Sequence, residues 1–144
     1  MCLKSMVDKN DIGNICHEHI EFYSLKSLKY LFETNGLEIF KIEENEINGG
    51  SFRIYCRKFK TGSIKLPNED VSEMMKKFVK RVKFNKKITM NFLKKRKKEG
   101  KTIFLYGAST KGNTLLQYYG ITSKLVPFAA ERSPDKWKKY TIGT

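Results

Sequence analysis

The chain contains two histidines, and both flank a single glutamate in the tripeptide His17-Glu18-His19. Histidine titrates near neutral pH, so it suits proton abstraction, and a neighbouring carboxylate can set its tautomer and pKa. The tripeptide lacks the spacing of the helical zinc motif HExxH. In an extended segment, however, both imidazoles would point the same way and could bind a metal with help from elsewhere. A general base, a structural pair and a metal site are therefore the alternatives.

A second group of polar residues lies in YGASTKGNT, residues 106–114, between an apolar run and a predicted helix. Backbone N–H groups and the positive end of the helix dipole should converge there, as in anion sites. Gly107 and Gly112 have P-loop spacing, but Asn113 stands where lysine is required, and GxGxxG fails at Ser109. The alternatives are a tight turn without a ligand and a phosphate or ribose site. The polar candidates are Ser109, Thr110, Lys111 and, after the next strand, Glu131.

The elements around this turn indicate a βαβ unit. The apolar run KTIFLYG (101–107) predicts a strand, and Leu115, Leu116 and Tyr119 share one helical face in a segment that ends at Gly120. LVPFAA (125–130) predicts a second strand, irregular or at an edge because its proline cannot donate a ladder hydrogen bond. Strand, glycine turn, helix and strand form one βαβ unit.

The first part of the chain has a different order of elements. Ser24 can cap a helix that Gly36 ends, and LEIFKI (37–42) predicts a strand. NEINGGS (45–51) predicts a turn, and SFRIYCRKF (51–59) alternates in polarity as a two-faced strand does. The predicted order is helix, strand, turn, strand.

The net charge of +14 is concentrated in one segment, because residues 76–101 carry 13 Lys/Arg and one acid. An apolar stripe from Val71 to Val82 predicts one long helix over 69–99, with Asn68 as a candidate cap and Gly100 at its end. A connector helix with a solvated lysine face is one interpretation. Nucleic-acid binding and docking on an acidic partner or anionic surface are the others.

The composition indicates a folded protein of the cytoplasm. Hydrophobic residues make up 40% of 144, but no stretch approaches the ~20 apolar residues that span a bilayer. The start, MCLKSMVDKNDIG, has no apolar region of a secretory signal. Three widely spaced cysteines, without a CxxC pair, fit a reducing compartment better than a disulfide framework or a zinc site.

Three motifs, in the same order, resemble the family of S-adenosylmethionine-dependent sugar C-methyltransferases. Residues 14–55, with HEH and the Asn-Gly-Gly-Ser turn, look like the end of the family's catalytic domain, where a Tyr-x-Glu-His stretch opens the last helix. Residues 101–119 are similar to the glycine turn that begins its C-terminal domain. ERSPDKWKKYTIGT (131–144) resembles a family Asp-Arg-Asn-Pro…Tyr-Thr-Pro-Gly-Thr stretch.

The resemblance implies a reaction and assigns residues to it. Family members act on nucleotide-linked keto-deoxysugars: a base removes the proton beside the ketone, and the enolate carbon attacks the sulfonium methyl. His19 matches the family's base and Glu18 the acid beside it, whereas His17 has no implied role. The implied residues for binding the nucleotide-sugar are Gly107, Ser109, Lys111, Gly112, Asn113, Glu131 and Arg132.

The chain departs from the family pattern at several points. Cys16 stands where the family often has tyrosine, and Glu131 replaces aspartate. Relative to the family, the chain looks truncated at both ends. The S-adenosylmethionine site would lie mostly outside it, zinc would belong only to the family's N-terminal cysteine region, and the chain alone is expected to be inactive. We predict no metal ligands here.

The predicted fold class is α/β. Residues 1–66 would form the tail of a Rossmann-like methyltransferase domain, residues 67–100 a connector helix, and residues 101–144 the first βαβ of a second Rossmann-like domain. The predicted partners are a nucleotide-linked sugar and the remainder of the enzyme, with no membrane. A non-catalytic nucleotide-sugar-binding module or pseudoenzyme is the alternative function. A basic nucleic-acid-binding protein is the third reading, and the confinement of charge to one helix argues against it.

Overall fold

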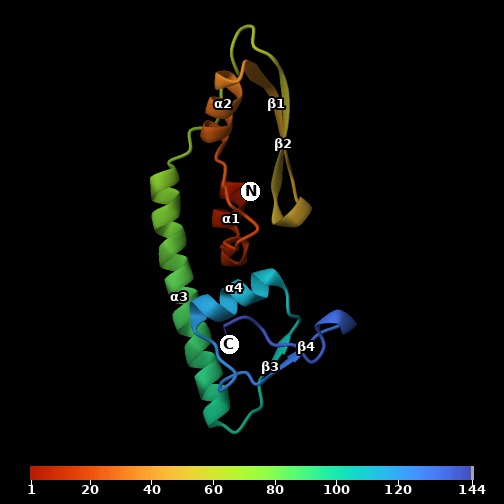
Figure 1. Ribbon diagram of the computed structural model, residues 1–144. Coiled ribbons are helices and arrows are strands. Elements are labelled where there is room, and N and C mark those ends of the chain that lie inside the picture. The colour runs from red at the N-terminus through yellow and green to blue at the C-terminus, as the bar shows by residue number, and fades with distance from the viewer. Residues whose placement is uncertain (144) are drawn as a thin grey trace. The chain divides into compact units, whose positions relative to one another are not determined.

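The computed structural model describes residues 1–143, apart from the side chain of Asn48, and forms two compact units (Figure 1). The first unit contains residues 1–11 and 19–78, and the second contains residues 12–18 together with the chain from Val79 onward. The segment that holds Cys16, His17 and Glu18 therefore belongs to the second unit, whereas His19 belongs to the first. The predicted bounds 1–66, 67–100 and 101–144 stay a prediction, and Thr144 lies outside the described residues.

The first unit is built from two short helices, an antiparallel hairpin and the start of a longer helix that continues into the second unit. Helix α1 (Leu3–Asp8) precedes α2 (Leu25–Thr34), which begins at a capping box formed by Ser24 and Ser27. Strand β1 (Leu37–Asn45) pairs with β2 (Ser51–Lys58) through the short helix η2 (Ile47–Gly49), as Figure 1 shows. The predicted order of helix, strand, turn and strand is confirmed. Its buried apolar side chains are Met6, Val7, Leu25, Ile39 and Phe78.

Strand β1 also buries a charge, which the sequence pattern did not indicate. The Glu38 carboxylate has no exposed surface and accepts a hydrogen bond from Arg57 Nε at 2.7 Å. Its second oxygen accepts from the backbone N–H groups of Lys60, Thr61 and Gly62, at 2.8, 2.8 and 2.6 Å. The loop after β2 therefore folds back around this carboxylate, and the ion is both paired and fully hydrogen-bonded.

The predicted long helix is confirmed as α3 (Val71–Lys98), a single helix of 28 residues. Asp70 caps it by accepting from Glu73 N at 3.0 Å, so the expectation of Asn68 in this role was wrong. Gly100 ends it in a left-handed conformation with φ +74°, and Lys101 N donates to Arg96 O at 3.1 Å, the pattern of a Schellman motif. The boundary between the two units falls inside α3, after Phe78.

The second unit contains the predicted βαβ. Strand β3 (Phe104–Tyr106) and β4 (Phe128–Ala130) pair in parallel, and α4 (Thr110–Tyr119) connects them. Two 3₁₀ helices complete it, η1 (Ile12–Asn14) and η3 (Pro134–Lys136). Its buried apolar side chains come from four segments and include Ile12, Val82, Leu116 and Ile121. Both strands are shorter than the predicted 101–107 and 125–130, and β4 begins only after Pro127, which cannot donate to the ladder.

The observed fold is mixed α/β, with one antiparallel and one parallel pair of strands. The fold class is thereby confirmed at this level. In the part of the chain that the structure describes, no helix is both long enough and apolar enough to cross a membrane.

Candidate functional site

The glycine turn joins β3 to α4 and crosses the end of β4. Gly107 has φ +86°, a conformation that favours glycine, and its N–H donates to Ala130 O at 2.7 Å. A Cβ at Gly107 would meet no atom within 4 Å, so the backbone conformation rather than crowding calls for glycine here. The turn is thus anchored to the carboxyl end of the neighbouring parallel strand.

Ser109 caps helix α4. Its hydroxyl oxygen accepts a hydrogen bond from Gly112 N at 3.1 Å, which satisfies one of the amides left open at a helix start. Two of the predicted binding residues, Ser109 and Gly112, therefore bond to each other. The serine hydroxyl keeps its hydrogen for donation, whereas the Gly112 amide is already occupied.

Glu131 directly follows β4 and bonds back to the turn. One carboxylate oxygen accepts from Ala108 N at 2.7 Å, and the other accepts from Ser133 N at 3.0 Å. These N–H groups, first that of Ser133 and then that of Ala108, hold the pKa of Glu131 below its usual range, and the charge of Lys136 at 3.9 Å adds to the effect. The carboxylate is therefore ionised at neutral pH and engaged with backbone.

Two residues that sequence reasoning missed support this arrangement. Lys136 Nζ donates to Ala108 O at 2.9 Å, and Trp137 Nε1 donates to Glu131 O at 2.7 Å. The signal available in the sequence was the spacing of Lys136 five positions after Glu131, in a segment with proline at 134. The short helix η3 makes this contact possible because it turns the chain back toward the glycine turn.

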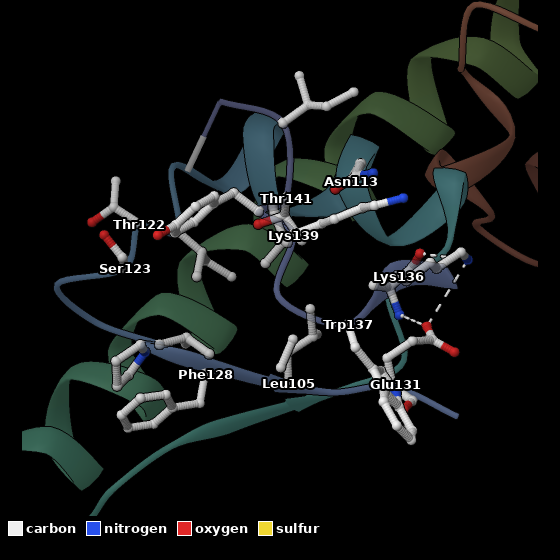
Figure 2. Close-up of a pocket in the computed structure, with 18 of the residues that line it drawn as sticks. Leu105, Asn113, Thr122, Ser123, Phe128, Glu131, Lys136, Trp137, Lys139 and Thr141 are labelled. Atoms are coloured by element: carbon white, nitrogen blue, oxygen red, sulfur yellow. Dashed lines mark hydrogen bonds and ion pairs between the residues drawn. The ribbon is translucent and has the colours of Figure 1, made fainter. Parts of the chain in front are cut away.

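A pocket of about 730 Å³ opens beside these residues, within the second unit (Figure 2). Figure 2 shows Thr122 and Ser123 at one end and Glu131 with Lys136 at the other. Asn113, on the first turns of α4, lines the pocket, and its side-chain oxygen is buried without a hydrogen-bond partner among the described residues. Further lining residues are Thr110, Trp137, Lys139, Tyr140 and Thr141.

The tripeptide segment meets the start of α4 in this unit. Helix η1 packs against α4, and Thr110 Oγ1 donates to Glu18 Oε1 at 3.4 Å, across 92 positions of sequence. His17 and Glu18 are exposed and lie in a turn rather than an extended segment, so the geometry that would align both imidazoles for a metal is not adopted. His19 is half-buried, and its role as base stays a prediction.

The structure brings some of the predicted site residues together. Asn113 and Glu131 line the pocket, as do Ala108 and Thr110 from the glycine turn. Arg132 is exposed and follows Glu131 directly, and Cys16 is half-buried. The remaining predicted residues, Gly107, Ser109, Lys111 and Gly112, lie in the turn and the first turn of α4 but do not line the pocket.

Comparison with known proteins identifies the class to which this fold and turn belong. A family described as the C-methyltransferase C-terminal domain matches residues 46–144, and the chain belongs to the C-methyltransferase family. It is similar to C-methyltransferase NovU of Streptomyces niveus, with 25% identity over 154 aligned positions. That alignment covers 99% of this chain and 37% of the relative, so the chain spans little more than a third of the relative's length. The family resemblance inferred from the motifs is confirmed.

Proposed function

We propose that this chain is part of an enzyme that transfers a methyl group from S-adenosylmethionine to the carbon beside the ketone of a nucleotide-linked keto-deoxysugar. Membership of the C-methyltransferase family supports the reaction class. The observation that carries the finer proposal is the contact between Glu18 and Thr110 within the second unit. It joins Glu18, the neighbour of the proposed base in the sequence, to the first residue of the helix that follows the glycine turn.

In the proposed mechanism His19 acts as the general base. The ketone acidifies the adjacent C–H bond, His19 accepts that proton, and the bonding electrons form the enolate. The enolate carbon then attacks the methyl group carried by the donor's sulfonium. Glu18 positions the base electrostatically, and its own position is influenced by the Thr110 hydroxyl at 3.4 Å. We assign no residue of this chain to the methyl donor.

We propose that the nucleotide-linked part of the substrate occupies the pocket of the second unit. Its volume of about 730 Å³ lies within the range of small-molecule sites. The first turn of α4 presents the positive end of a helix dipole, and Lys139 adds positive charge. The parallel strands β3 and β4 joined by α4 fit the start of a Rossmann-like domain, in which ligands bind outside the carboxyl ends of the strands.

The test uses an intact enzyme that carries this segment, assayed by methyl transfer to a nucleotide-linked keto sugar. The substitution His19→Asn keeps some hydrogen bonding but cannot accept the proton. We expect kcat to fall roughly 10²–10⁴-fold, because general-base catalysis acts in the transition state more than in binding. His17→Asn is the matched control and should cost much less, and Glu18→Gln should fall between the two.

Exchange of the substrate proton beside the ketone with solvent deuterium separates the base from the later methyl transfer. If His19→Asn exchanges that proton at the wild-type rate, another residue is the base and this part of the proposal is wrong. Loss of exchange and of methyl transfer in parallel supports it.

A non-catalytic nucleotide-sugar-binding module is the second candidate, and one observation favours it. Cys16 stands at the position where the resembling family often has tyrosine, so a phenol that could orient the sugar or share proton transfer is absent there. This alternative would be identified if the intact enzyme bound the nucleotide-sugar without transferring a methyl group, and if Cys16→Tyr restored methyl transfer.

We further propose that the protein is located in the cytoplasm and that the partner of this chain is the remainder of the enzyme.

A further inference from the structure

Ala108, in the glycine turn, is held at both of its polar backbone atoms. Its N–H donates to Glu131 Oε2 at 2.7 Å, and its carbonyl oxygen accepts from Lys136 Nζ at 2.9 Å. The carboxylate and the ammonium lie 3.9 Å apart, which closes a ring of three contacts that Figure 2 shows beside the pocket. The two charged side chains therefore hydrogen-bond to the N–H and the C=O of the same residue of the turn.

We infer that Glu131 and Lys136 are positioning residues that fix the glycine turn for the nucleotide's phosphates, and that Glu131 does not bind the ribose. We call this pair the Glu131–Lys136 clamp. The inference rests on the proposed function only in naming a nucleotide as the ligand of the turn. The clamp itself is a property of contacts within the second unit.

The access to Glu131 argues against a ribose contact. Its side chain is 16% exposed, and each of its oxygens already accepts a backbone N–H, from Ala108 and from Ser133. A carboxylate that holds a ribose diol needs lone pairs open to the ligand. Charge-assisted bonds of 2.7–3.0 Å are the strong kind, and they hold both oxygens toward the backbone. A sugar hydroxyl would have only the remaining lone pairs of a side chain that is 16% exposed.

The clamp also limits which amides can meet an anion. The N–H of Gly107 is bonded to Ala130 O, that of Ala108 to Glu131, and that of Gly112 to Ser109. Each of these three N–H groups is therefore already hydrogen-bonded to another residue of the second unit. An arriving phosphate would therefore meet a turn whose shape is set in advance, which lowers the ordering cost of binding.

The first experiment needs no ligand and uses the full chain. Amide hydrogen exchange of Ala108, followed by NMR, reports the clamp directly. In Glu131→Ala we expect the Ala108 amide to exchange roughly tenfold faster or more, because a hydrogen bond to a charged group is lost. Lys136→Met should accelerate it by a smaller factor, and Glu131→Asp should restore part of the protection. Asp135→Asn is the matched control in the same loop and should change nothing.

The Gly112 amide serves as an internal reference, because Ser109 rather than the clamp protects it. If Ala108 exchanges at the wild-type rate in Glu131→Ala while Gly112 stays protected, the clamp does not form and the inference is wrong. If both amides lose protection together, the whole turn has unfolded, and the milder Lys136→Met then decides. Faster exchange at Ala108 alone in that variant supports the clamp, whereas no change overturns it.

The second experiment measures binding of inorganic pyrophosphate, uridine and uridine diphosphate by calorimetry, because the ribose of uridine carries both hydroxyls of the diol. A clamp predicts that Glu131→Ala weakens binding of pyrophosphate and uridine diphosphate by a similar factor and leaves binding of uridine unchanged. Weaker uridine binding with unchanged pyrophosphate binding would assign Glu131 to the ribose and overturn the inference. Tighter pyrophosphate binding would also overturn it, because Glu131 would then compete with the anion. If the wild type binds none of the three, the proposed nucleotide site fails, while amide exchange still tests the clamp.

Discussion

At the scale of single residues, Glu38 carries the best-defined electrostatics in the molecule. The backbone N–H of Lys60 contributes most to lowering its pKa, and Arg57 with the N–H groups of Thr61 and Gly62 adds to it. Burial opposes them, yet the pKa falls from its ordinary 4.5 to about 2. Because the folded protein binds this proton less readily than the unfolded chain, ionised Glu38 stabilises the fold above pH ~4.5.

Acid should therefore weaken the first unit in a defined window. The stabilisation from Glu38 is lost as the pH falls from about 4.5 toward 2, where the folded-state carboxylate takes up its proton. We expect Glu38→Gln to lower the melting temperature at pH 7, and the difference from wild type to narrow as the pH falls through that window. Thermal unfolding by circular dichroism measures both effects.

Glu43→Gln is the matched control, since Glu43 lies on the same strand and its side chain is 36% exposed. It should change the melting temperature much less. A melting temperature of Glu38→Gln equal to wild type at pH 7 would show that the buried carboxylate is not stabilising.

Gly107 and Gly112 differ in whether the backbone conformation requires glycine. At Gly107 the φ of +86° is strained for any side chain, so Gly107→Ala should destabilise the second unit by roughly 1–2 kcal/mol. Gly112 is helical, and a Cβ there would lie 3.4 Å from Ser109 Oγ, so Gly112→Ala should change stability by less than ~1 kcal/mol. Urea denaturation of both variants checks the difference. Equal destabilisation by the two substitutions would contradict the assignment.

The residue types in the sequence allowed the Ser24 cap and the helix end at Gly100 to be predicted, because each follows from local backbone chemistry. The partners of Glu38 and Glu131 could not be predicted in the same way. Both carboxylates bond to backbone N–H groups that any residue provides, so no side-chain pattern marks them. The Glu18–Thr110 contact was hidden for a different reason, since the two residues lie 92 positions apart.

At the scale of elements, α3 allows a controlled test of which face packs. Val82 is 4% exposed and Val79 is 42% exposed, and both lie in the interior of the same helix. Val82→Ala should destabilise the protein by about 2 kcal/mol, from lost burial and a residual cavity. Val79→Ala should stay within ~0.5 kcal/mol, because alanine's higher helix propensity offsets the smaller loss of contact.

Chemical denaturation followed by circular dichroism measures the free energy of unfolding of both variants. The comparison is controlled because both substitutions are Val→Ala in the same helix. If Val79→Ala costs as much as Val82→Ala, the outward face of α3 is packed as well, and the burial pattern described above is wrong.

The apolar period was enough to predict α3 as one helix, because the stripe from Val71 to Val82 and the glycine at position 100 agree, although the predicted cap at Asn68 was wrong. Strand bounds were predicted less well. Strand β1 continues to Asn45, past the predicted end at 42, with an irregularity in register between Ile39 and Lys41. Hairpin pairing extends strands through polar residues, because each added residue gains ladder hydrogen bonds that side-chain polarity does not reveal.

At the scale of the whole molecule, the chain crosses between its two units more than once. Residues 12–18 belong to the second unit although they are flanked on both sides by the first. Sequence order had placed HEH wholly within the first segment, since adjacent motifs are usually assigned to one domain. Packing of η1 against α4 determines the outcome instead, and Ile12 and Leu116 are both buried in the second unit.

S-adenosylmethionine is the methyl donor of the proposed reaction, and we predict that this chain alone does not bind it. The motifs of the chain that resemble the family are HEH, the Asn-Gly-Gly-Ser turn, the glycine turn and residues 131–144, and none of them is the family's glycine-rich donor site. The described residues contain two sheets of two strands each. We therefore expect no binding of S-adenosylmethionine by calorimetry, with a Kd weaker than ~1 mM, the low end of measurable affinity.

Uridine diphosphate provides the positive control, because the proposed pocket lies within the second unit and needs no other segment. In the same titration, Gly107→Ala should weaken binding of the nucleotide, since that substitution strains the turn. The absence of S-adenosylmethionine binding should not change. Micromolar binding of S-adenosylmethionine by this chain would instead place a donor site among residues 1–143. The glycine turn at the start of α4 would then be the first place to look, and Gly107→Ala would have to weaken the donor as well.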